Sequence, residues 1–540
     1  MTLLSTVYRK TGAALCCHVD DPTRRPEEVT MTKRSDTLTK LLGTSVLSGC
    51  LAAGAAVAET QLNVAMKSQP PTLDLHVTST NTVRNVGAHI NEGLFTFDAD
   101  FAPQPMLAES VETSDDGLTY TIAIRQGVPF HNGDELAASD VVASLDRWMA
   151  RSSFGRTLAR YVETLDASDD HTVVLTLNQP ASFVVTALTT WRAGPFIYPE
   201  EVIEAAGEER ITDPIGTGPF RFVEWNEGQD IVLERFDDYA ALDTPASGYA
   251  GKREALVDTL RFVFVPELSV RRIGVESGDF HVALDIDPDS YDQYQDNPEV
   301  VSFLGAPRMT TFIPNKAEGI MADVGLRRAV QAAVCVEDIL PVYGGDAFWR
   351  VDPSMTWKET AWWSDAGAEL YNVCDTEKAQ SLAAEAGYDG APIRLAVSSD
   401  DESKFSVAQI LEQQLRGAGF NVTLEVRDAA AHEATLDSKD GWDFAISEHT
   451  YRTHPILHSH LQATWTGWWE SEERDRLVGE FLTASAEDAA RIWDEIHALY
   501  YQDVVVIKIG DYFEHHIAAD EVQGYANMPE PFFWNVSLAD

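Results

Sequence analysis

The stretch that decides the fold covers residues 115–147 and reads DDGLTYTIAIRQGVPFHNGDELAASDVVASLDR. Apolar and polar side chains alternate over 118–125, which is the period of a half-buried strand. Turn-forming residues follow at 131–134. From Ser139, a residue type that caps helices, apolar side chains recur at helical spacing. The stretch therefore predicts a strand, a loop and a helix in a mixed α/β protein.

The pattern outside this stretch is also mixed. We expect strands at 171–177, 218–225, 230–236 and 256–266 and a short helix at 268–277. The second half is richer in helix, with helices expected at 323–340, 375–386, 404–418 and 487–501 and strands at 393–397, 421–426, 443–446 and 503–509. No Ser/Gly/Pro-rich linker separates the halves, so we expect lobes joined by crossing segments.

The composition restricts the partners of the chain. Its 540 residues contain 86 Asp and Glu against 40 Lys and Arg, which gives a formal charge of −46. Binding to nucleic acid needs clustered basic side chains, and an anionic membrane surface would repel this chain. With 44% hydrophobic and 23% charged residues the chain is expected to fold, and its length suggests two to four domains.

The N-terminus carries an export signal. Lys33 and Arg34 precede an apolar run over 41–58 that ends in Ala-Val-Ala, the pattern of a secretory cleavage site. We therefore predict a leader and signal peptide over 1–58, in which residues 1–30 are an over-extended start. The mature protein is then expected in the periplasm. A second interpretation is a lipoprotein signal that leaves a lipidated Cys50. A lipidated Cys50 would leave a second function open, that of a membrane-anchored sensor or adaptor that takes no part in transport.

Removal of the leader changes the charge and the cysteine count. It takes away seven basic and five acidic residues, which leaves 33 basic and 81 acidic residues and a charge of −48. Cys335 and Cys374 remain, and in an exported protein they favour a disulfide, although two buried free thiols stay possible. A catalytic cysteine is not favoured, because Cys335 has apolar neighbours in a helical pattern and no basic partner nearby.

Eight segments in this order resemble the extracytoplasmic solute-binding proteins of family 5, the peptide, nickel and opine receptors of ABC importers. The resemblance covers 59–540, and its segments are PTLD (71–74), HINEGLFTFD (89–98), PMLAES (105–110), the stretch 115–147, GTGPF (216–220), SVRRIGVESGDFHVAL (269–284), LRRAVQAAV (326–334) and EKAQSLAAEAGYDG (377–390).

The resemblance implies an α/β, two-lobed type II periplasmic-binding-protein fold of cluster C, with an extra subdomain inserted in the first lobe. The first lobe would comprise 59–91, 213–308 and 506–540, with the insertion at 92–212 and the second lobe at 309–505. Such a protein would be a monomeric receptor that closes around an oligopeptide-like or modified organic solute and delivers it to an inner-membrane ABC permease. It would need no cofactor, bind no nucleic acid and catalyse no reaction, and no nucleophile elbow or phosphate-binding loop appears in the sequence.

Two departures from the family bear on the ligand. Peptide-binding members hold the ligand amine with an Asp, and His454 stands at that place. A neutral imidazole cannot replace a carboxylate facing an ammonium group. Dipeptide members bind the ligand carboxylate with an Arg, where this chain has Phe405 and Ser406 next to Lys404. Both departures speak against a generic dipeptide specificity.

The candidate ligand-binding residues follow from the same resemblance and from their side-chain chemistry. Arg452 could pair with an anionic group and Trp465 could stack on the solute. The full set is Thr78, Thr80, Glu448, Tyr451, Arg452, His454 and Trp465.

The alternative function is that of a metal or metal-chelate receptor, for nickel or haem. His449, His454, His458 and His460 lie within twelve positions. If 454–458 were helical, His454 and His458 would share one face and could ligate a metal. Cleft-lining polar side chains and a solvated loop are the competing interpretations.

Overall fold

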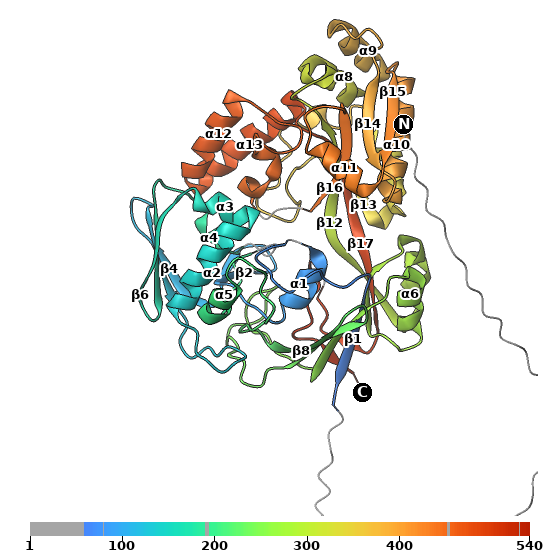
Figure 1. Ribbon diagram of the computed structural model, residues 1–540. Helices are drawn as coiled ribbons and strands as arrows, with labels where there is room; N and C mark the ends of the chain where they lie inside the picture. The colour runs from blue at the N-terminus through green and yellow to red at the C-terminus, as the bar shows by residue number, and fades with distance from the viewer. Residues whose placement is uncertain are drawn as a thin grey trace, which may run out of the picture. The chain divides into compact units, whose positions relative to one another are not determined.

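Two long strands link the two halves of the molecule. In this computed structural model, β12 (Val300–Pro314) and β17 (Ile507–Ala519) pair antiparallel over most of their length. One end of the pair adjoins β16 (Phe444–Thr450) and the other adjoins β11 (Val282–Ile286), so both lobes share one sheet (Figure 1). The structure describes residues 59–78, 80–189, 194–450, 454–526, 528 and 530–539, and the predicted leader lies outside them.

The shared sheet has the order β15-β14-β16-β12-β17-β11-β1-β10-β9-β8, and β13 pairs with β17. The first lobe supplies β1 (Gln61–Met66), β8 (Phe220–Asn226), β9 (Asp230–Arg235), β10 (Thr259–Phe264) and β11. The second lobe supplies β13 (Trp349–Arg350), β14 (Ile393–Ser398), β15 (Val422–Arg427) and β16. Since β1 is parallel to β10 and β11, and β14 is parallel to β15 and β16, each lobe has a parallel sheet core.

Helices cover this sheet. The first lobe has α1 (Asn81–Gly87), α6 (Leu268–Glu276) and α7 (Tyr291–Gln295), and the second has α8 (Val324–Ala333), α9 (Thr376–Glu385), α10 (Glu402–Gly417), α11 (Ala429–Leu436), α12 (Glu472–Thr483) and α13 (Ala486–Asp503). Short 3-10 turns lie at η1 (Pro288–Ser290), η2 (Ile320–Ala322), η3 (Val336–Asp338), η4 (Leu340–Tyr343), η5 (Asp346–Phe348), η6 (Ala368–Leu370), η7 (Pro455–Leu457) and η8 (Ser459–Leu461). Among the described residues, no helix is long and apolar enough to span a membrane.

The segment that was predicted to be an insertion contains a sheet of its own, in the order β4-β5-β7-β6. In β5 (Thr119–Ile124) buried side chains alternate with half-buried ones, as the sequence predicted, and α2 (Ala138–Arg151) follows. The other elements are β2 (Phe95–Phe97), β3 (Pro103–Pro105), β4 (Ala108–Thr113), β6 (Val162–Asp169), β7 (Thr172–Leu177), α3 (Ser153–Ala159), α4 (Val184–Thr189) and α5 (Glu200–Ala206). The small strands β18 (Val522–Gln523) and β19 (Ser537–Leu538) pair near the C-terminus. The domain boundaries given above stay a prediction.

A buried ion pair fixes the first lobe and its insertion to each other. Arg147 of α2 contacts Asp74 at 2.6 Å, and both side chains are almost fully buried. The carboxylate of Asp74 also accepts a hydrogen bond from the Ile211 backbone N–H. Burial alone would raise the pKa of Asp74. The hydrogen bonds from Arg147 and from the Ile211 N–H, together with the Arg147 charge, outweigh burial and hold this pKa below its usual value. A charged carboxylate therefore orders the chain just before Thr78 and Thr80.

The prediction of one helix over 323–340 is wrong beyond Ala333. Cys335 has an extended backbone, with φ −109° and ψ 100°. The Gln414 side chain accepts from the Cys335 N–H at 3.1 Å and donates to its carbonyl at 2.9 Å. These bonds satisfy the backbone groups that a helix would have used, so the helix ends. The sulfur atoms of Cys335 and Cys374 are 1.94 Å apart, in a disulfide.

Candidate functional site

A cavity of about 750 Å³ lies where the two lobes meet the linking strands. Its first-lobe wall comes from the end of β1, the start of α6 and residues 285–289, and its second-lobe wall from residues 342–344 and the start of α10. Arg308 of β12 and residues 512–515 of β17 lie between these walls. Because both lobes contribute to it, its shape depends on how they are closed.

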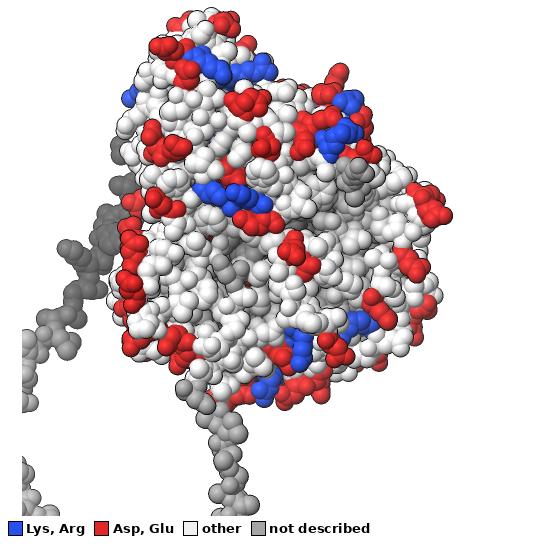
Figure 2. Space-filling model, turned by 180° about the vertical axis from the view of Figure 1, so that it is seen from behind, with Lys and Arg blue, Asp and Glu red and all other residues white. Residues whose placement is uncertain are grey.

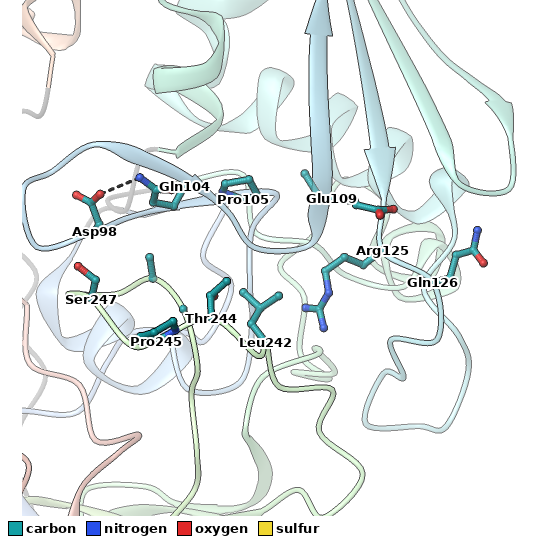
Figure 3. Close-up of a pocket in the computed structure, with 13 residues that line it drawn as sticks. Asp98, Gln104, Pro105, Glu109, Arg125, Gln126, Leu242, Thr244, Pro245 and Ser247 are labelled. Atoms are coloured by element: carbon teal, nitrogen blue, oxygen red, sulfur yellow. Dashed lines mark hydrogen bonds between the residues drawn. The ribbon is translucent and has the colours of Figure 1, made fainter.

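A second cavity, of about 910 Å³, is confined to the first lobe and its insertion (Figure 3). Gln104 donates to Asp98 at 2.8 Å on one side of it. The Arg125 guanidinium donates to the carbonyls of Met106 at 3.1 Å and Ala240 at 2.7 Å, so it ties two segments of the lobe together. Among the residues that the structure describes, none of the second lobe lines this larger cavity. We therefore take the interlobe cavity as the candidate site.

The interlobe cavity is acidic. Among the described residues that line it, the carboxylates are Asp285, Asp287, Asp289, Glu402 and Glu514, and the basic side chains are Lys67 and Arg308. Arg308 forms an ion pair with Glu514. Carboxylates also spread more widely than basic side chains over the face shown in Figure 2, which is hollowed near its middle. The cavity thus offers more negative than positive charge to a ligand.

Aromatic side chains form part of the cavity wall. The rings of Tyr343 and Tyr512 are stacked, with centroids 4.2 Å apart and planes 8° apart. The Tyr343 hydroxyl is hydrogen-bonded to the Thr310 hydroxyl and donates to Glu448 at 3.5 Å. Burial and the Glu448 carboxylate raise the pKa of Tyr343 well above its usual value. The wall is therefore neutral and aromatic here.

The predicted site residue Glu448 lies next to this aromatic pair. Its carboxylate is 3.5 Å from the Lys404 ammonium group, and Asp401 lies 2.9 Å from the same group. Burial would lower the pKa of Lys404, but the two carboxylates outweigh it and the pKa is raised. Two carboxylates therefore already neutralise Lys404, the residue next to Phe405 and Ser406, where the family resemblance leads us to expect an Arg in dipeptide receptors.

Thr78 and Thr80 lie at the start of α1. Their hydroxyl groups are 2.7 Å apart, and the Thr78 hydroxyl also accepts from the Thr80 backbone N–H at 3.2 Å. Thr80 is exposed. Tyr451 and Arg452, two further predicted residues, lie outside the described residues.

The helix on which the metal alternative depended does not form. Residues 454–458 form no α-helix: η7 spans Pro455–Leu457, and His454 caps it by accepting from the Ile456 N–H. His454 is 5% exposed and packs against Trp362, with ring centroids 4.7 Å apart. Burial lowers its pKa to about 3. His454 is thus a neutral side chain of the second-lobe core, placed there by a tryptophan 92 positions upstream.

The other histidines of the cluster lie among aromatic rings. His449 of β16 is hydrogen-bonded to the Thr311 hydroxyl at 2.8 Å. The His460 ring lies 4.8 Å from the His449 ring and 4.5 Å from the ring of Trp465, which is half-buried. In the described part of the chain, neither His454 nor His458 belongs to a group of three or more side chains that could hold a metal.

Within the described ranges, one group of side chains could hold a metal: Asp285, Glu514 and His516, whose ligating atoms lie within 4.8 Å of one another. The donor chemistry does not fit. His516 Nδ1 accepts a hydrogen bond from the Asp285 backbone N–H at 3.0 Å, so the proton of the neutral ring is on Nε2. Neither nitrogen then has a free lone pair, and Glu514 is already paired with Arg308.

Sequence reasoning missed the residues that line this cavity. A signal was present, since the run Asp285-Ile286-Asp287-Pro288-Asp289 places three carboxylates directly after a strand. Glu402 gave no such signal, because the first turn of a helix is a common place for an acidic residue.

Comparison with known proteins identifies the family. The model of the bacterial extracellular solute-binding proteins, family 5 Middle, matches residues 102–467. The chain is 26% identical to a probable peptide ABC transporter periplasmic-binding protein of Sinorhizobium fredii, over 83% of this chain and 88% of that protein. It is 26% identical to the glutathione-binding protein GsiB of Salmonella typhi, over 86% of this chain and 91% of that one.

Among solved structures, the chain resembles the periplasmic binding protein AgaA from A. tumefaciens, solved in complex with agropinic acid. The TM-score is 0.72 at 22% identity, over 89% of this chain and 99% of the other. The fold is thus the two-lobed type II periplasmic-binding-protein fold. The chain belongs to family 5 of the bacterial extracellular solute-binding proteins, which are binding proteins and not enzymes.

Proposed function

We propose that the chain is the periplasmic solute receptor of an ABC importer. It binds an oligopeptide-like or modified organic solute between its lobes, closes around it and delivers it to an inner-membrane permease. The names of its relatives support an organic ligand, since they are a probable peptide-transport protein, a glutathione-binding protein and, with a similar fold, a protein bound to agropinic acid.

The observation that carries this proposal is the interlobe cavity. Its volume of about 750 Å³ is in the usual range for small-molecule sites. Both lobes and both linking strands contribute to its wall, so a bound solute would contact all the parts that move when such a protein closes. A ligand that contacts both lobes stabilises the closed state over the open one.

The predicted contact residues Thr78, Thr80, Glu448, Tyr451, Arg452, His454 and Trp465 remain part of the proposal. Glu448 has the strongest support among those described, because it contacts Tyr343 in the cavity wall. His454 has the least, because its ring is buried.

The proposal includes export. The signal peptide is cleaved after Ala58 and the mature receptor is a periplasmic monomer, with lipidation of Cys50 as the minority alternative. Mass spectrometry of the mature N-terminus distinguishes the two, since it begins at Glu59 in one case and at a lipidated Cys50 in the other.

A thermal-shift screen tests the function. Purified protein is unfolded and refolded to remove any bound solute, and then melted with short peptides, glutathione and opines in separate samples. A solute at 100 times its Kd stabilises the protein by about 2.7 kcal/mol, which raises Tm measurably. Stabilisation by at least one organic solute supports the proposal. An unchanged Tm with every organic solute, together with stabilisation by Ni²⁺ or haem, would refute it.

A further inference from the structure

The disulfide joins two segments that both contact the linking strand β17. One segment, 335–343, leads from Cys335 through η3 to η4, and the other, 370–374, ends at Cys374. Both segments reach β17 at residues 509–510. The bond between them therefore lies close in the chain to two contacts with a strand that joins the lobes.

The contacted part of β17 is a β-bulge. Along β12, the neighbours Thr310 and Thr311 pair with Gly510 and Lys508, so the register skips Ile509. A bulge bends its strand and disrupts the ladder locally. The path of β17 at this point therefore depends more on contacts from outside the ladder.

The two segments joined by the disulfide supply such contacts. The Tyr371 hydroxyl donates to the Ile509 carbonyl at 3.1 Å. Leu340 of η4 packs on the backbone of Gly510, where an added Cβ would lie only 2.8 Å from the Leu340 Cδ1 atom. Leu340 and Ile509 are buried in one apolar cluster, and Tyr371 packs against it. Each side of the disulfide thus supports the bulge.

The backbone beside the disulfide has an unfavourable conformation. The φ angle is 51° at Cys374 and 50° at Asn372, and such positive values are tolerated by Asn but are uncommon for Cys. The Asn372 side chain accepts from the Val336 N–H at 3.0 Å, which links the two segments again. A strained residue keeps its conformation only while its surroundings hold it. Cleavage of the disulfide would therefore let Cys374 relax and displace the neighbouring Asn372 and Tyr371.

The disulfide is open to attack from solution, because Cys374 is exposed while Cys335 is half-buried. A thiolate of a dithiol attacks the Cys374 sulfur, forms a mixed disulfide and releases the Cys335 thiolate, which takes up a proton. The second thiol of the reagent then displaces the Cys374 sulfur, which also ends as a thiol. Two electrons pass to the protein, and the dithiol becomes a cyclic disulfide.

We propose that the disulfide between Cys335 and Cys374 is a redox-sensitive brace of the linking strand β17. In the oxidised protein it holds Tyr371 and Leu340 against the bulge and so fixes the path of β17 between the lobes. Reduction by a dithiol releases these contacts and lowers the population of the closed arrangement, and with it the affinity for solute. The effect on solute binding rests on the proposed function, whereas the effect on the strand does not.

Hydrogen exchange of the refolded, solute-free protein tests the brace. Samples with and without dithiothreitol are compared by mass spectrometry, under conditions in which circular dichroism shows the reduced protein to be folded. Reduction should speed exchange over 507–513 of β17 at least about threefold and leave β14, in the same lobe and sheet, unchanged. A bond that only adds global stability would speed exchange equally in both strands or in neither.

Variants assign the effect to the brace. Tyr371→Phe removes the hydroxyl that donates to β17 and keeps the disulfide, so it should reproduce part of the faster exchange without dithiothreitol. The matched control is Tyr388→Phe, which removes a hydroxyl that donates to the carbonyl three positions on, and it should exchange as the wild type does. The double variant Cys335→Ala with Cys374→Ala should match the reduced wild type and not respond to dithiothreitol.

Equal exchange of β17 in the oxidised and reduced protein would overturn the inference, as would equal acceleration in β17 and β14. If the reduced protein does not stay folded, the comparison of Tyr371→Phe with Tyr388→Phe decides, and equal exchange in these two variants overturns the inference.

Small-angle X-ray scattering of the same samples tests the coupling to lobe closure. Reduction should raise the radius of gyration, because fewer molecules are closed, and an unchanged radius would overturn the coupling. None of these results depends on a solute. A failure of every organic solute to bind would remove the proposed function and leave the effect on the strand to be judged by exchange alone.

Discussion

Ser182 and Leu482 join the predicted insertion to the second lobe. The backbone N–H and the hydroxyl of Ser182 both donate to the Leu482 carbonyl, at 2.9 and 3.2 Å. The neighbouring side chains of Phe183 and Phe481 are buried in the same apolar cluster. In Figure 1, α12 and α4, which adjoin these residues, lie on the side of the molecule away from α6 and the linking strands. The contact therefore bridges the lobes at a distance from the hinge.

Removal of the Ser182 hydroxyl should favour the open state. Ser182→Ala deletes one hydrogen bond between the lobes, worth about 1 kcal/mol, so the ratio of closed to open molecules should fall about fivefold. Fluorescence energy transfer between one label on each lobe measures this ratio. Ser168→Ala, which removes a hydroxyl bond within the insertion, is the matched control and should leave the ratio unchanged. An unaltered ratio in Ser182→Ala would show that this contact does not hold the lobes together.

Loss of the disulfide should destabilise the protein. Cys335 and Cys374 are 39 positions apart, and closing a loop of that length is worth about 3–4 kcal/mol by the chain-entropy model. The double variant Cys335→Ala with Cys374→Ala should therefore unfold at a lower urea concentration. A reducing agent should shift the wild type to the same midpoint and leave the variant unchanged. If reduction leaves the wild-type midpoint unaltered, the bond makes no contribution.

Stability should fall as the pH is lowered below about 6.5, because buried histidines cannot take up protons in the folded state. Burial lowers the pKa of His454 to about 3 and that of His76 and His497 to about 4. These folded-state values lie below the unfolded value of about 6.5, so the unfolded state binds protons first as the pH falls. His454 alone should account for about 2 kcal/mol between pH 8 and pH 5.

Urea unfolding of the wild type and of His454→Asn at both pH values isolates this contribution. Asn keeps a cap acceptor for η7 and cannot be protonated in this range. The variant should lose less stability between pH 8 and pH 5 than the wild type does. Equal losses would mean that His454 is protonated in the folded protein, contrary to its buried position.

Removal of the Arg147 charge should be more damaging than removal of the whole pair. Arg147→Met leaves the buried carboxylate of Asp74 without its cation, which should cost about 3–5 kcal/mol. Adding Asp74→Asn removes the unpaired charge and should restore part of that loss. A urea-based double-mutant cycle measures the recovery. Additive effects of the two substitutions would contradict a direct pair.

Much of the fold could be predicted from local patterns. The strand β5 and the helices α2, α9 and α10 could be predicted from residue spacing. In each of them the period at which apolar side chains recur shows which face packs against the rest of the protein. The prediction failed at Cys335, whose backbone is bonded by a side chain 79 positions away. No local pattern contains that information.

The site was less predictable for the same reason. The family resemblance directed attention to His454, but its burial is due to Trp362 and Phe481 on other segments. The acidic cavity combines residues near 285, 402 and 514, which are far apart in the sequence. With so many acidic residues in the chain, only the fold distinguishes these carboxylates from those on the surface.

Native mass spectrometry of the protein purified from the periplasm, before and after unfolding and refolding, tests the central claim most directly. We predict that the untreated sample contains a 1:1 complex with an organic solute, that refolding removes the solute, and that Tm falls as a result. The same bare mass and the same Tm before and after refolding, with no change in either on adding peptide, glutathione or opine, would contradict the account.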